Sequence, residues 1–276
     1  MFHVSCFMLL SIIITSYKNP ELLKVCIDSV KRNIAITDCE IIVSDSETGE
    51  DTEMLMRENF PEIKFFPFDE NVGLARLVEV AYETSRGDYL LFLNGDVIVK
   101  KGSIEKLLEY VRDNPSVGMA GPQLLNFNES LQFSCYRFYE PMTIVYRRTF
   151  LGKLGFAQKH LDSFLMKDFD HKSIREVDWL MGSALMIRRK AIEKVGLMDL
   201  RYKLYFEDTD WCRRFWEKGY KVVYNPESQM YHYHGRGSAG QGVLKTLLSK
   251  KLAWVHILSA LKYFWKYLGK PAPKHS

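Results

Sequence analysis

The feature that most constrains the fold is an alternation of strand-like and helix-like segments over the first 121 residues. Short apolar runs typical of buried strands lie at residues 9–15, 40–43, 63–66, 89–93 and 117–121. Segments with helical spacing of apolar residues lie between them, at residues 19–30, 51–59, 73–86 and 103–113. Such alternation with short connections is typical of a mostly parallel sheet with helices on both faces. The sequence therefore predicts an α/β fold.

Polar residues follow four of these strand-like runs. Thr15-Ser16-Tyr17 follows the first, Asp45 the second, Asn71 the third and Asn94-Gly95-Asp96 the fourth. In open α/β sheets, ligands bind just outside the carboxyl ends of the strands. We therefore expect one ligand site built from these polar residues.

The turn Asn94-Gly95-Asp96 follows a buried run of five apolar residues, Tyr89–Leu93. Amide and carboxylate oxygens are hard ligands that suit Mg²⁺ or Mn²⁺, and through the ion they suit a diphosphate. Asn, Gly and Asp are also common turn residues where no ligand binds. On its own the turn is compatible with both interpretations.

Composition and charge restrict the partners that the chain is expected to bind. Its 276 residues are 47% apolar and 26% charged, which suits one large globular domain or two smaller ones. The formal net charge is +4, and residues 243–276 hold seven lysines and no acidic residue. A local basic patch is therefore expected, and a nucleic-acid surface is not. Five scattered cysteines without a Cys-x-x-Cys pair indicate reduced thiols in the cytoplasm.

The second half of the chain is less regular. Residues 122–139 suit a hairpin, and residues 179–187 return to a buried character. Residues 140–176 are aromatic and basic with little periodicity, which suits a long loop over the site. Residues 207–216 have helical spacing, and residues 220–224 form a short strand-like run.

The last segment, residues 251–268, has the pattern of an amphipathic helix. Its apolar side consists of Trp254, Ile257, Leu258, Leu261, Phe264, Trp265 and Leu268. Lysines fall on the other side, together with Ser259 and His256. This pattern suits an anionic membrane surface, with packing on its own domain or a homodimer contact as the alternatives. Charges interrupt the segment too often for a membrane-spanning helix.

Eight motifs in the chain together resemble the inverting glycosyltransferases of family 2, and among them the rhamnosyltransferase-like members. They lie at residues 11–17 (SIIITSY), 41–46 (IIVSDS), 69–75 (DENVGLA), 86–97, 121–124 (GPQL), 178–184 (DWLMGSA), 207–210 (EDTD) and 232–235 (HYHG). Each motif is weak alone, but all eight occur in the family's order and spacing. The resemblance covers about residues 9 to 238.

The resemblance implies a GT-A-type fold, a nucleotide-sugar donor, a divalent metal (Mn²⁺ or Mg²⁺) and a single displacement with inversion. It places the glycosyltransferase domain at residues 1–238. The donor half would cover about residues 9–122 and the acceptor half about residues 123–238. Residues 239–276 would be a basic, amphipathic, helical extension.

The resemblance also assigns donor and metal roles to residues that follow the strands. The positions that match the donor site are Thr15, Tyr17, Asp45, Asn71, Gly73, Arg76, Asn94, Gly95 and Asp96. Asp96 would bind the metal directly, and His234 is a candidate for a further ligand. Asn94 stands where the family's motif has Asp, which lowers the charge of the site. Arg76 fits a solvated helix face as well as a diphosphate contact.

By the same resemblance, Asp208 is the catalytic base, Glu207 holds the acceptor, and Trp179 and Gly182 form the acceptor edge. The residues support the base independently, because Glu207-Asp208 follows an aromatic run that would desolvate a carboxylate and raise its pKa. Asp210 suits the capping of the following helix. For the whole acidic cluster the alternative is helix capping, and for Trp179 it is a place in the core.

The predicted function is transfer of rhamnose or another hexose from a nucleoside-diphosphate sugar to a hydroxyl of a cell-surface polysaccharide or lipid-linked glycan precursor. The alternative is a non-catalytic scaffold of the same fold at the membrane. Nicotinamide-dependent oxidoreductases and phosphate-loop NTPases do not fit, since the chain has neither glycine-rich motif. We expect the protein in the cytoplasm, and on the cytoplasmic face of the membrane if the basic tail binds lipid.

Overall fold

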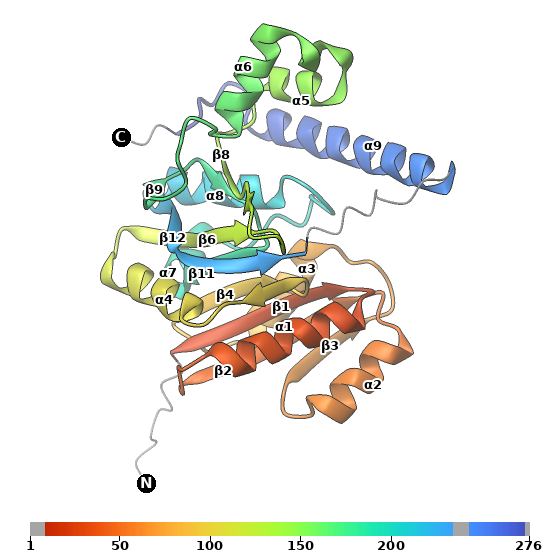
Figure 1. Ribbon diagram of the computed structural model, residues 1–276, viewed down its shortest axis with the longest axis vertical. Helices are drawn as coiled ribbons and strands as arrows, with labels where there is room; N and C mark the ends of the chain where they lie inside the picture. The colour runs from red at the N-terminus through yellow and green to blue at the C-terminus, as the bar shows by residue number, and fades with distance from the viewer. Residues whose placement is uncertain (1–8, 234–242, 274–276) are drawn as a thin grey trace.

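The computed structural model describes residues 9–233 and 243–273, whose arrangement is shown in Figure 1. Within this part of the chain, the framework is a 10-stranded sheet whose main path runs β3-β2-β1-β4-β11-β6-β12-β5. The strands of this path are β1 (Leu10–Tyr17), β2 (Cys39–Ser46), β3 (Lys64–Phe68), β4 (Tyr89–Asn94), β5 (Val97–Val99), β6 (Val117–Leu125), β11 (Ala184–Arg188) and β12 (Lys221–His232).

Along the main path of this sheet, four of the seven neighbouring strand pairs run parallel. β1 pairs in parallel with β2 and β4, β2 with β3, and β6 with β12. β11 runs antiparallel between β4 and β6, and β5 runs antiparallel beside β12 at the edge. The expected mostly parallel α/β sheet is confirmed.

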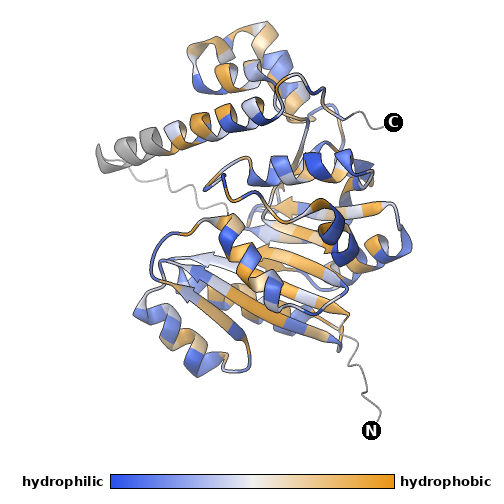
Figure 2. Cartoon of the chain, turned by 180° about the vertical axis from the view of Figure 1, so that it is seen from behind, coloured by the Kyte–Doolittle hydropathy of each residue, from blue (hydrophilic) through white to orange (hydrophobic). Residues whose placement is uncertain are grey.

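Helices cover both faces of the sheet, each over its own apolar cluster. Buried residues of α1 (Pro20–Asn33), α2 (Glu50–Asn59) and α4 (Ser103–Asp113) belong to one cluster. Those of α3 (Leu74–Thr84), α7 (Arg189–Val195) and α8 (Glu207–Glu217) belong to the other. Figure 2 shows the consequence, with largely hydrophobic strands between helices whose outer faces are hydrophilic. Two apolar layers therefore hold the sheet on both sides.

The first helix illustrates how local sequence produces an element. The side chain of Asn19 caps α1 by accepting a hydrogen bond from the N–H of Leu22, and Pro20 occupies the first turn. Apolar residues then recur every three or four positions and are fully buried, namely Leu23, Cys26, Ile27 and Val30. The cap fixes where α1 begins, and the apolar spacing fixes which side meets the sheet.

The second half contains the expected hairpin, in which β6 pairs with β7 (Leu131–Gln132). Two short strands, β8 (Cys135–Tyr136) and β10 (Trp179–Leu180), form a separate two-stranded sheet. The strand expected at residues 220–224 is longer than predicted, because β12 passes a register shift between Asn225 and Gln229 and then pairs with β5. β9 (Arg175–Glu176) pairs with β12 on its other side.

The long loop expected at residues 140–176 was a wrong prediction. The segment forms α5 (Pro141–Arg148), a short 3₁₀ helix η1 (Phe150–Lys153) and α6 (Gly155–Phe164). The side chains of Glu140 and Thr143 form a capping box at the start of α5. Several apolar residues of this unit are exposed, including Met142, Phe150 and Phe156, so the sequence lacks the apolar spacing by which buried helices are recognised.

The C-terminal helix α9 (Val243–Lys266) packs on its own domain, against α5 and the segment that precedes α8. Its buried side chains include His256, Ser259, Ala260 and Tyr263, and Tyr267 just after the helix is buried as well. Most of the predicted apolar side faces the solvent instead, with Trp254 64% and Trp265 80% exposed, while Ile257 and Phe264 are half-buried against the domain. The expected amphipathic helix is therefore present, but it buries the side that carries His256 and Ser259. In the part of the chain that the structure describes, no helix is both long and apolar enough to cross a membrane.

Candidate active site

The register of the parallel strands brings the predicted donor residues to one edge of the sheet. Thr15 of β1 lies between Ser44 of β2 and Asn94 of β4. Ser16 is paired with Asp45. The ends of three neighbouring strands therefore meet where the sequence predicts a ligand site.

The turn after β4 is fixed by hydrogen bonds to two other loops. The N–H of Gly95 donates to the carbonyl of Thr15 at 2.7 Å, and the N–H of Asn94 donates to the carbonyl of Ser183 at 2.9 Å. A Cβ atom on Gly95 would lie 3.2 Å from the Cβ of Ser16, which explains the glycine. The turn is thus held in place from both sides, and the carboxylate of Asp96 remains partly accessible at its end.

Asp96 faces a histidine that the sequence analysis did not select. His232 at the end of β12 is paired with Val97, and its Nε2 lies 3.4 Å from Oδ1 of Asp96. The other ring nitrogen, Nδ1, lies 2.7 Å from Oε1 of Gln132, which orients the ring. The predicted ligand His234 lies outside the described residues. His232 begins the HYHG motif at residues 232–235, but only the pairing of β12 with β5 shows that it faces Asp96.

The pair of Asp96 and His232 fits a divalent cation. A carboxylate oxygen and an imidazole nitrogen that face each other across 3.4 Å are suitable ligands for Mn²⁺. Among the described residues, no cluster of three or more His, Cys, Asp or Glu side chains could hold a metal ion. A cation at Asp96 would therefore take its other ligands from a diphosphate, from water or from residues that the structure does not describe.

Asp45 is the most deeply buried of the predicted donor residues. Its side chain is fully buried, and neither carboxylate oxygen has a hydrogen bond of good geometry among the described residues. Burial raises the pKa of this carboxyl above its ordinary value, while the hydroxyls of Ser16 and Thr48 and the N–H of Ser46 partly stabilise its charged form. A buried carboxyl with only such weak partners is costly, so this position suits a ligand that brings its own N–H donors.

The loop with Asn71 and Gly73 joins the donor edge to the second half of the chain. The side chain of Asn71 accepts a hydrogen bond from the N–H of Gly73, and the hydroxyl of Ser46 accepts one from the N–H of Val72. Gly73 has a φ of +80°, and a Cβ there would lie 2.8 Å from the carbonyl oxygen of Lys203. Only glycine allows this loop to lie so close to the segment before α8.

Two of the predicted donor residues point toward solvent. Tyr17 is half exposed, and its hydroxyl donates a hydrogen bond to Glu47. Arg76 forms an ion pair with Glu79 one turn along α3. This ion pair agrees with one of the two alternatives for Arg76, a place on a solvated helix face. Its contact with a diphosphate remains a prediction.

The acidic pair Glu207-Asp208 begins α8, and the backbone of the two residues before it is strained. Tyr205 and Phe206 have φ values of 67° and 72°, in the left-handed region that bulky residues rarely adopt. Glu207 is buried, and its Oε2 has no hydrogen-bond partner among the described residues. Asp208 accepts hydrogen bonds from the N–H of Gly182 at 3.1 Å and of Thr209 at 2.7 Å. Consecutive strained residues are typical of functional sites.

The carboxyls of Glu207 and Asp208 differ in how strongly their surroundings favour the charged form. Burial and the neighbouring charge of Asp208 raise the pKa of Glu207 to about 8. Burial also raises the pKa of Asp208, but the N–H groups of Gly182 and Thr209 stabilise its charged form. The first proton of the pair is therefore lost from Asp208, while Glu207 stays neutral at neutral pH.

A single loop connects the donor turn to this acidic pair. Ser183 accepts the N–H of Asn94, and the preceding residue Gly182 donates its N–H to Asp208. A Cβ on Gly182 would lie 3.3 Å from the Cβ of Asp208. Gly182, predicted as part of the acceptor edge, thus orients Asp208 through its backbone. The turn that leads to Asp96 and the carboxylate of Asp208 are thus bonded to two neighbouring residues of one loop.

Trp179 lies in an aromatic wall beside the acidic pair. Its ring stacks on Tyr136 and Tyr139, with centroids 4.4 and 5.6 Å apart, and its N–H donates to the carbonyl of Arg137. Tyr139 in turn lies 4.6 Å from the ring of Phe206. Trp179 is buried, so the accessible part of the wall is formed by Tyr139, which the sequence analysis did not select.

Asp210 does not cap α8, contrary to the prediction. The N-cap position belongs to Phe206, and Asp210 lies fully buried inside the first turn. Its carboxylate pairs with Arg214 at 2.8 Å and Lys266 at 2.6 Å, and it accepts the hydroxyl hydrogen of Tyr267. Asp210 therefore connects the helix that carries the acidic pair to α9.

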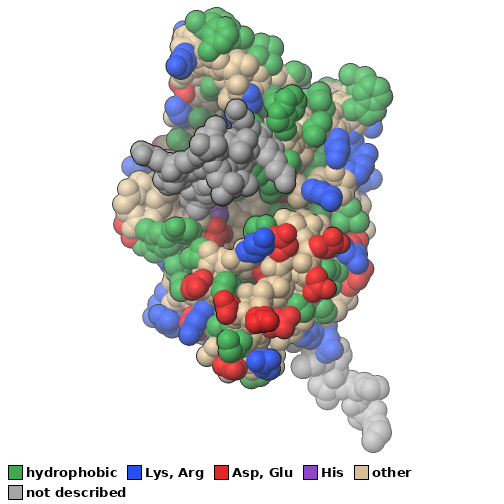
Figure 3. All heavy atoms as spheres, turned by 90° about the vertical axis from the view of Figure 1, so that its right-hand side faces the viewer, with side chains coloured by type: hydrophobic (Ala, Val, Ile, Leu, Met, Phe, Trp, Pro, Cys, Tyr) green, Lys and Arg blue, Asp and Glu red, His purple; other side chains and the backbone are tan. Residues whose placement is uncertain are grey.

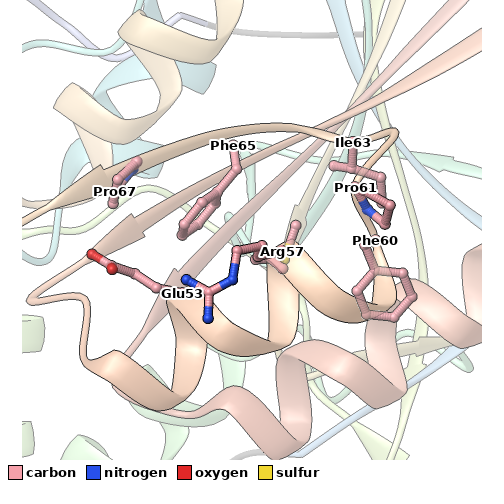
Figure 4. A pocket seen from close by; sticks show the side chains of 8 residues that line it. Glu53, Arg57, Phe60, Pro61, Ile63, Phe65 and Pro67 are labelled. Carbon is pink, nitrogen blue, oxygen red and sulfur yellow. The ribbon is translucent and has the colours of Figure 1, made fainter.

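A hollow between α2 and β3 lies apart from the predicted site residues (Figure 4). It is lined by Glu53, Met56, Arg57, Phe60, Pro61, Ile63, Phe65 and Pro67. None of the predicted donor, acceptor or metal residues is among them. We assign no role in catalysis to this hollow.

A mostly parallel sheet with polar strand ends and a nearby acidic pair is the arrangement of GT-A-type glycosyltransferases. The family described as "Glycosyl transferase family 2" matches residues 11–196. The chain belongs to this family and is a glycosyltransferase.

The relatives of the chain include several rhamnosyltransferases. It is 24% identical, over 82% of its length and 76% of the relative, to N-acetylglucosaminyl-diphospho-decaprenol L-rhamnosyltransferase of Mycobacterium tuberculosis. It is 26% identical to rhamnosyltransferase WbbL of Escherichia coli, over 72% of this chain and 69% of that one. The dTDP-rhamnosyl transferase RfbF of Shigella flexneri is 23% identical, over 81% of this chain and 68% of that one.

A solved structure supports the fold. The crystal structure of GalNAc-T7 with UDP, GalNAc and Mn²⁺ superposes with a TM-score of 0.59 at 15% identity. The match covers 82% of this chain and 44% of that one, so the present chain corresponds to less than half of that protein. The predicted GT-A-type fold is confirmed.

Proposed function

We propose that the protein transfers rhamnose or another hexose from a nucleoside-diphosphate sugar to a hydroxyl of a cell-surface polysaccharide or lipid-linked glycan precursor, with inversion. The position of Asp208 carries this proposal. Its carboxylate accepts the N–H of Gly182, and the next residue, Ser183, holds the turn that leads to Asp96. The bonds of both the proposed base and the Asn94-Gly95-Asp96 turn to one loop support a shared site for acceptor and diphosphate.

The donor would bind along the ends of β1, β2 and β4. Asp45 suits the base ring, because the N–H groups of a base would pair with its buried carboxyl oxygens. Thr15 and Tyr17 flank Ser16, the residue of β1 that is paired with Asp45. Asn71 and Gly73 form the adjacent loop. The diphosphate would then lie toward the Asn94-Gly95-Asp96 turn.

Asp96 and His232 would hold a divalent cation, with His234 as a further candidate. When bound, such an ion neutralises negative charge on the leaving diphosphate. Asn94 contributes an amide where a carboxylate is usual, so the protein supplies less charge to the ion than a pair of aspartates would. The expected consequence is a cation that binds tightly only together with the donor.

Asp208 would act as the general base. The acceptor hydroxyl loses its proton to the carboxylate of Asp208 as its oxygen bonds to the anomeric carbon, and the bond to the diphosphate oxygen breaks on the opposite face. One such displacement inverts the anomeric centre. Glu207, neutral and buried beside it, would donate a hydrogen bond to the acceptor and keep a second negative charge away from the base.

Rhamnose is the first sugar to test, because the relatives named above are rhamnosyltransferases, one of them a dTDP-rhamnosyl transferase. One relative is named for an acceptor with a diphosphate and a decaprenol chain, which favours a lipid-linked acceptor. The outward apolar side of α9 suits a protein that works at the cytoplasmic surface of a membrane.

A panel of nucleotide sugars tests the proposal. We expect dTDP-rhamnose to bind and to be slowly hydrolysed, and both effects to strengthen with Mn²⁺ or Mg²⁺. Calorimetry and release of the nucleoside diphosphate measure them. An absence of nucleotide-sugar binding with either ion would contradict the proposal, and binding without any turnover would favour the non-catalytic scaffold.

A further inference from the structure

Two neighbouring arginines, Arg147 and Arg148, lie at the end of α5. Arg147 and Arg148 are exposed, and neither forms an ion pair with an Asp or Glu among the described residues. Arg147 donates a hydrogen bond to the hydroxyl of Tyr139 at 2.6 Å, and its guanidinium carbon lies 5.5 Å from the ring centre of Phe164. The aromatic wall thus holds Arg147 in place and leaves its charge uncompensated.

These arginines lie beside the same aromatic rings as the acidic pair. Tyr139 packs on Phe206, which directly precedes Glu207. The pKa of Tyr139 is raised mainly by burial, then lowered by the charge of Arg147 and raised by that of Asp208. The charges of Arg147 and of Asp208 therefore both act on Tyr139. Tyr139 and Phe206 together lie between Arg147 and the acidic pair.

The electrostatics around the pair favour an anion. The pKa of Arg148 is lowered by desolvation and by the charge of Arg147. His256 of α9 faces the pair, and burial followed by the charges of Arg148 and Arg147 lowers its pKa to about 4. His256 is therefore neutral and neither adds to the charge nor compensates it. An anion between the two guanidinium groups would relieve their mutual repulsion.

An exposed apolar surface directly follows the arginines along the chain. We call it the apolar tip, and it consists of Phe150 on η1, Phe156 on α6 and Leu154 between the two helices, of which Phe150 is 77% exposed. In Figure 3, hydrophobic side chains gather at the top of the molecule, where Figure 1 places α5 and α6. Exposed aromatic residues in such a cluster are typical of a surface that meets a lipid or another apolar partner.

We propose that Arg147 and Arg148 bind the diphosphate of a polyprenyl-diphosphate-linked acceptor, whose sugar lies along Tyr139 toward Asp208 and whose hydrocarbon chain leaves over the apolar tip. This assignment rests on the proposed function. The order of groups on the protein, from carboxylate through aromatic wall and guanidinium pair to apolar tip, matches the order of sugar, diphosphate and chain in such a molecule. Guanidinium groups form paired hydrogen bonds to phosphate, which suits this role.

The test uses farnesyl diphosphate as the probe, with a saturating nucleoside diphosphate and Mg²⁺ to occupy the donor site. We expect the Arg147→Gln/Arg148→Gln double variant to bind the probe at least tenfold more weakly than the natural protein. Farnesol, which lacks the diphosphate, should bind both proteins equally weakly. Lys159→Gln is the matched control, because it removes an exposed charge of the same helical unit and should leave the affinity unchanged.

The outcomes separate this inference from the proposed function. The double variant should keep the donor affinity and donor hydrolysis of the natural protein, and its melting temperature should stay within a few degrees. Equal probe affinity in the natural protein and the double variant would overturn the inference while donor binding stands. A double lysine variant, Arg147→Lys/Arg148→Lys, should retain part of the affinity, since it keeps the charge but loses the paired geometry.

Discussion

At the scale of single residues, the site depends on two adjacent carboxyls in different environments. Asp208 has two backbone N–H donors, whereas Glu207 has an oxygen without a partner among the described residues. Proximity along the chain therefore does not make the two carboxyls equivalent. This difference supports the proposed roles of Asp208 as the base and of Glu207 as a neutral hydrogen-bond donor.

We predict that Asp208→Asn lowers the rate of transfer by about 10²–10⁴-fold, the usual contribution of a general base, without weakening donor binding. Glu207→Gln is the matched control and should cost far less, because a neutral carboxyl and an amide can both donate a hydrogen bond. Steady-state rates and calorimetry measure the two effects. Substantial transfer by Asp208→Asn would remove Asp208 from the mechanism.

Glu207 also makes a prediction about stability and pH. Its pKa is raised to about 8 by burial and by the charge of Asp208, above the unfolded value of about 4.3. The folded state therefore binds more protons in this interval, and stability should fall as the pH rises from about 4 to 8. Glu207→Gln should remove this loss, so its gain in melting temperature should be larger at pH 8 than at pH 4. An equal change at both pH values would contradict the prediction.

At the scale of elements, α8 and α9 are joined through Asp210. This fully buried carboxylate pairs with Arg214 of its own helix and with Lys266 and Tyr267 at the end of α9. Lys266 also pairs with Asp199, so one lysine connects α9 to two segments around the site. The helix that starts with the acidic pair is thus held from behind by the C-terminal helix.

Replacing Asp210 by Ala should lower the free energy of unfolding by about 3–5 kcal/mol, because it leaves buried cationic partners without their counter-charge. Urea denaturation measures the change. Glu217→Gln is the control on the same helix. It removes the half-exposed carboxylate that pairs with Arg213 and should cost less than about 1 kcal/mol. Equal effects of the two substitutions would show that Asp210 does not join the helices energetically.

At the scale of the whole molecule, the proposed donor edge of the sheet is accompanied by an exposed apolar stripe on α9. The exposed residues Trp254, Leu258, Leu261, Trp265 and Leu268 recur every three or four positions along α9 and just after its end. Tryptophans in such a stripe are typical of the interfacial region of a membrane. The opposite side of α9 is bound to the domain, so the helix can present this stripe without leaving its place.

We predict that Trp254→Gln/Trp265→Gln lowers binding to vesicles with anionic lipid roughly tenfold or more, through the lost burial of two indole rings. Val25→Gln/Met54→Gln, at exposed apolar positions of α1 and α2, should leave vesicle binding unchanged. Flotation with vesicles measures both. If the tryptophan variant instead converts a dimer into a monomer and vesicle binding is absent throughout, the stripe is a homodimer contact. Deleting residues 243–276 is a weaker test, because it would also uncover Asp210 and Tyr202.

Local sequence determined most of the fold and the class of chemistry. Caps and apolar spacing predict α1 and its neighbours, and polar residues after each strand mark the edge where Thr15 and Asn94 meet. Local signals could not predict α5, α6 or the role of Asp210, since exposed apolar residues and a buried carboxylate contradict the usual patterns.

What only the tertiary structure decided are the relations between distant segments. His232 reaches Asp96 through the pairing of β12 with β5, and Arg147 reaches the acidic pair through Tyr139 and Phe206. The sequence by itself determined which elements form and which residues could do chemistry, because caps and spacing act over a few residues. Which of those residues face one another depends on strand register and helix packing, which join residues that lie from tens to more than a hundred positions apart.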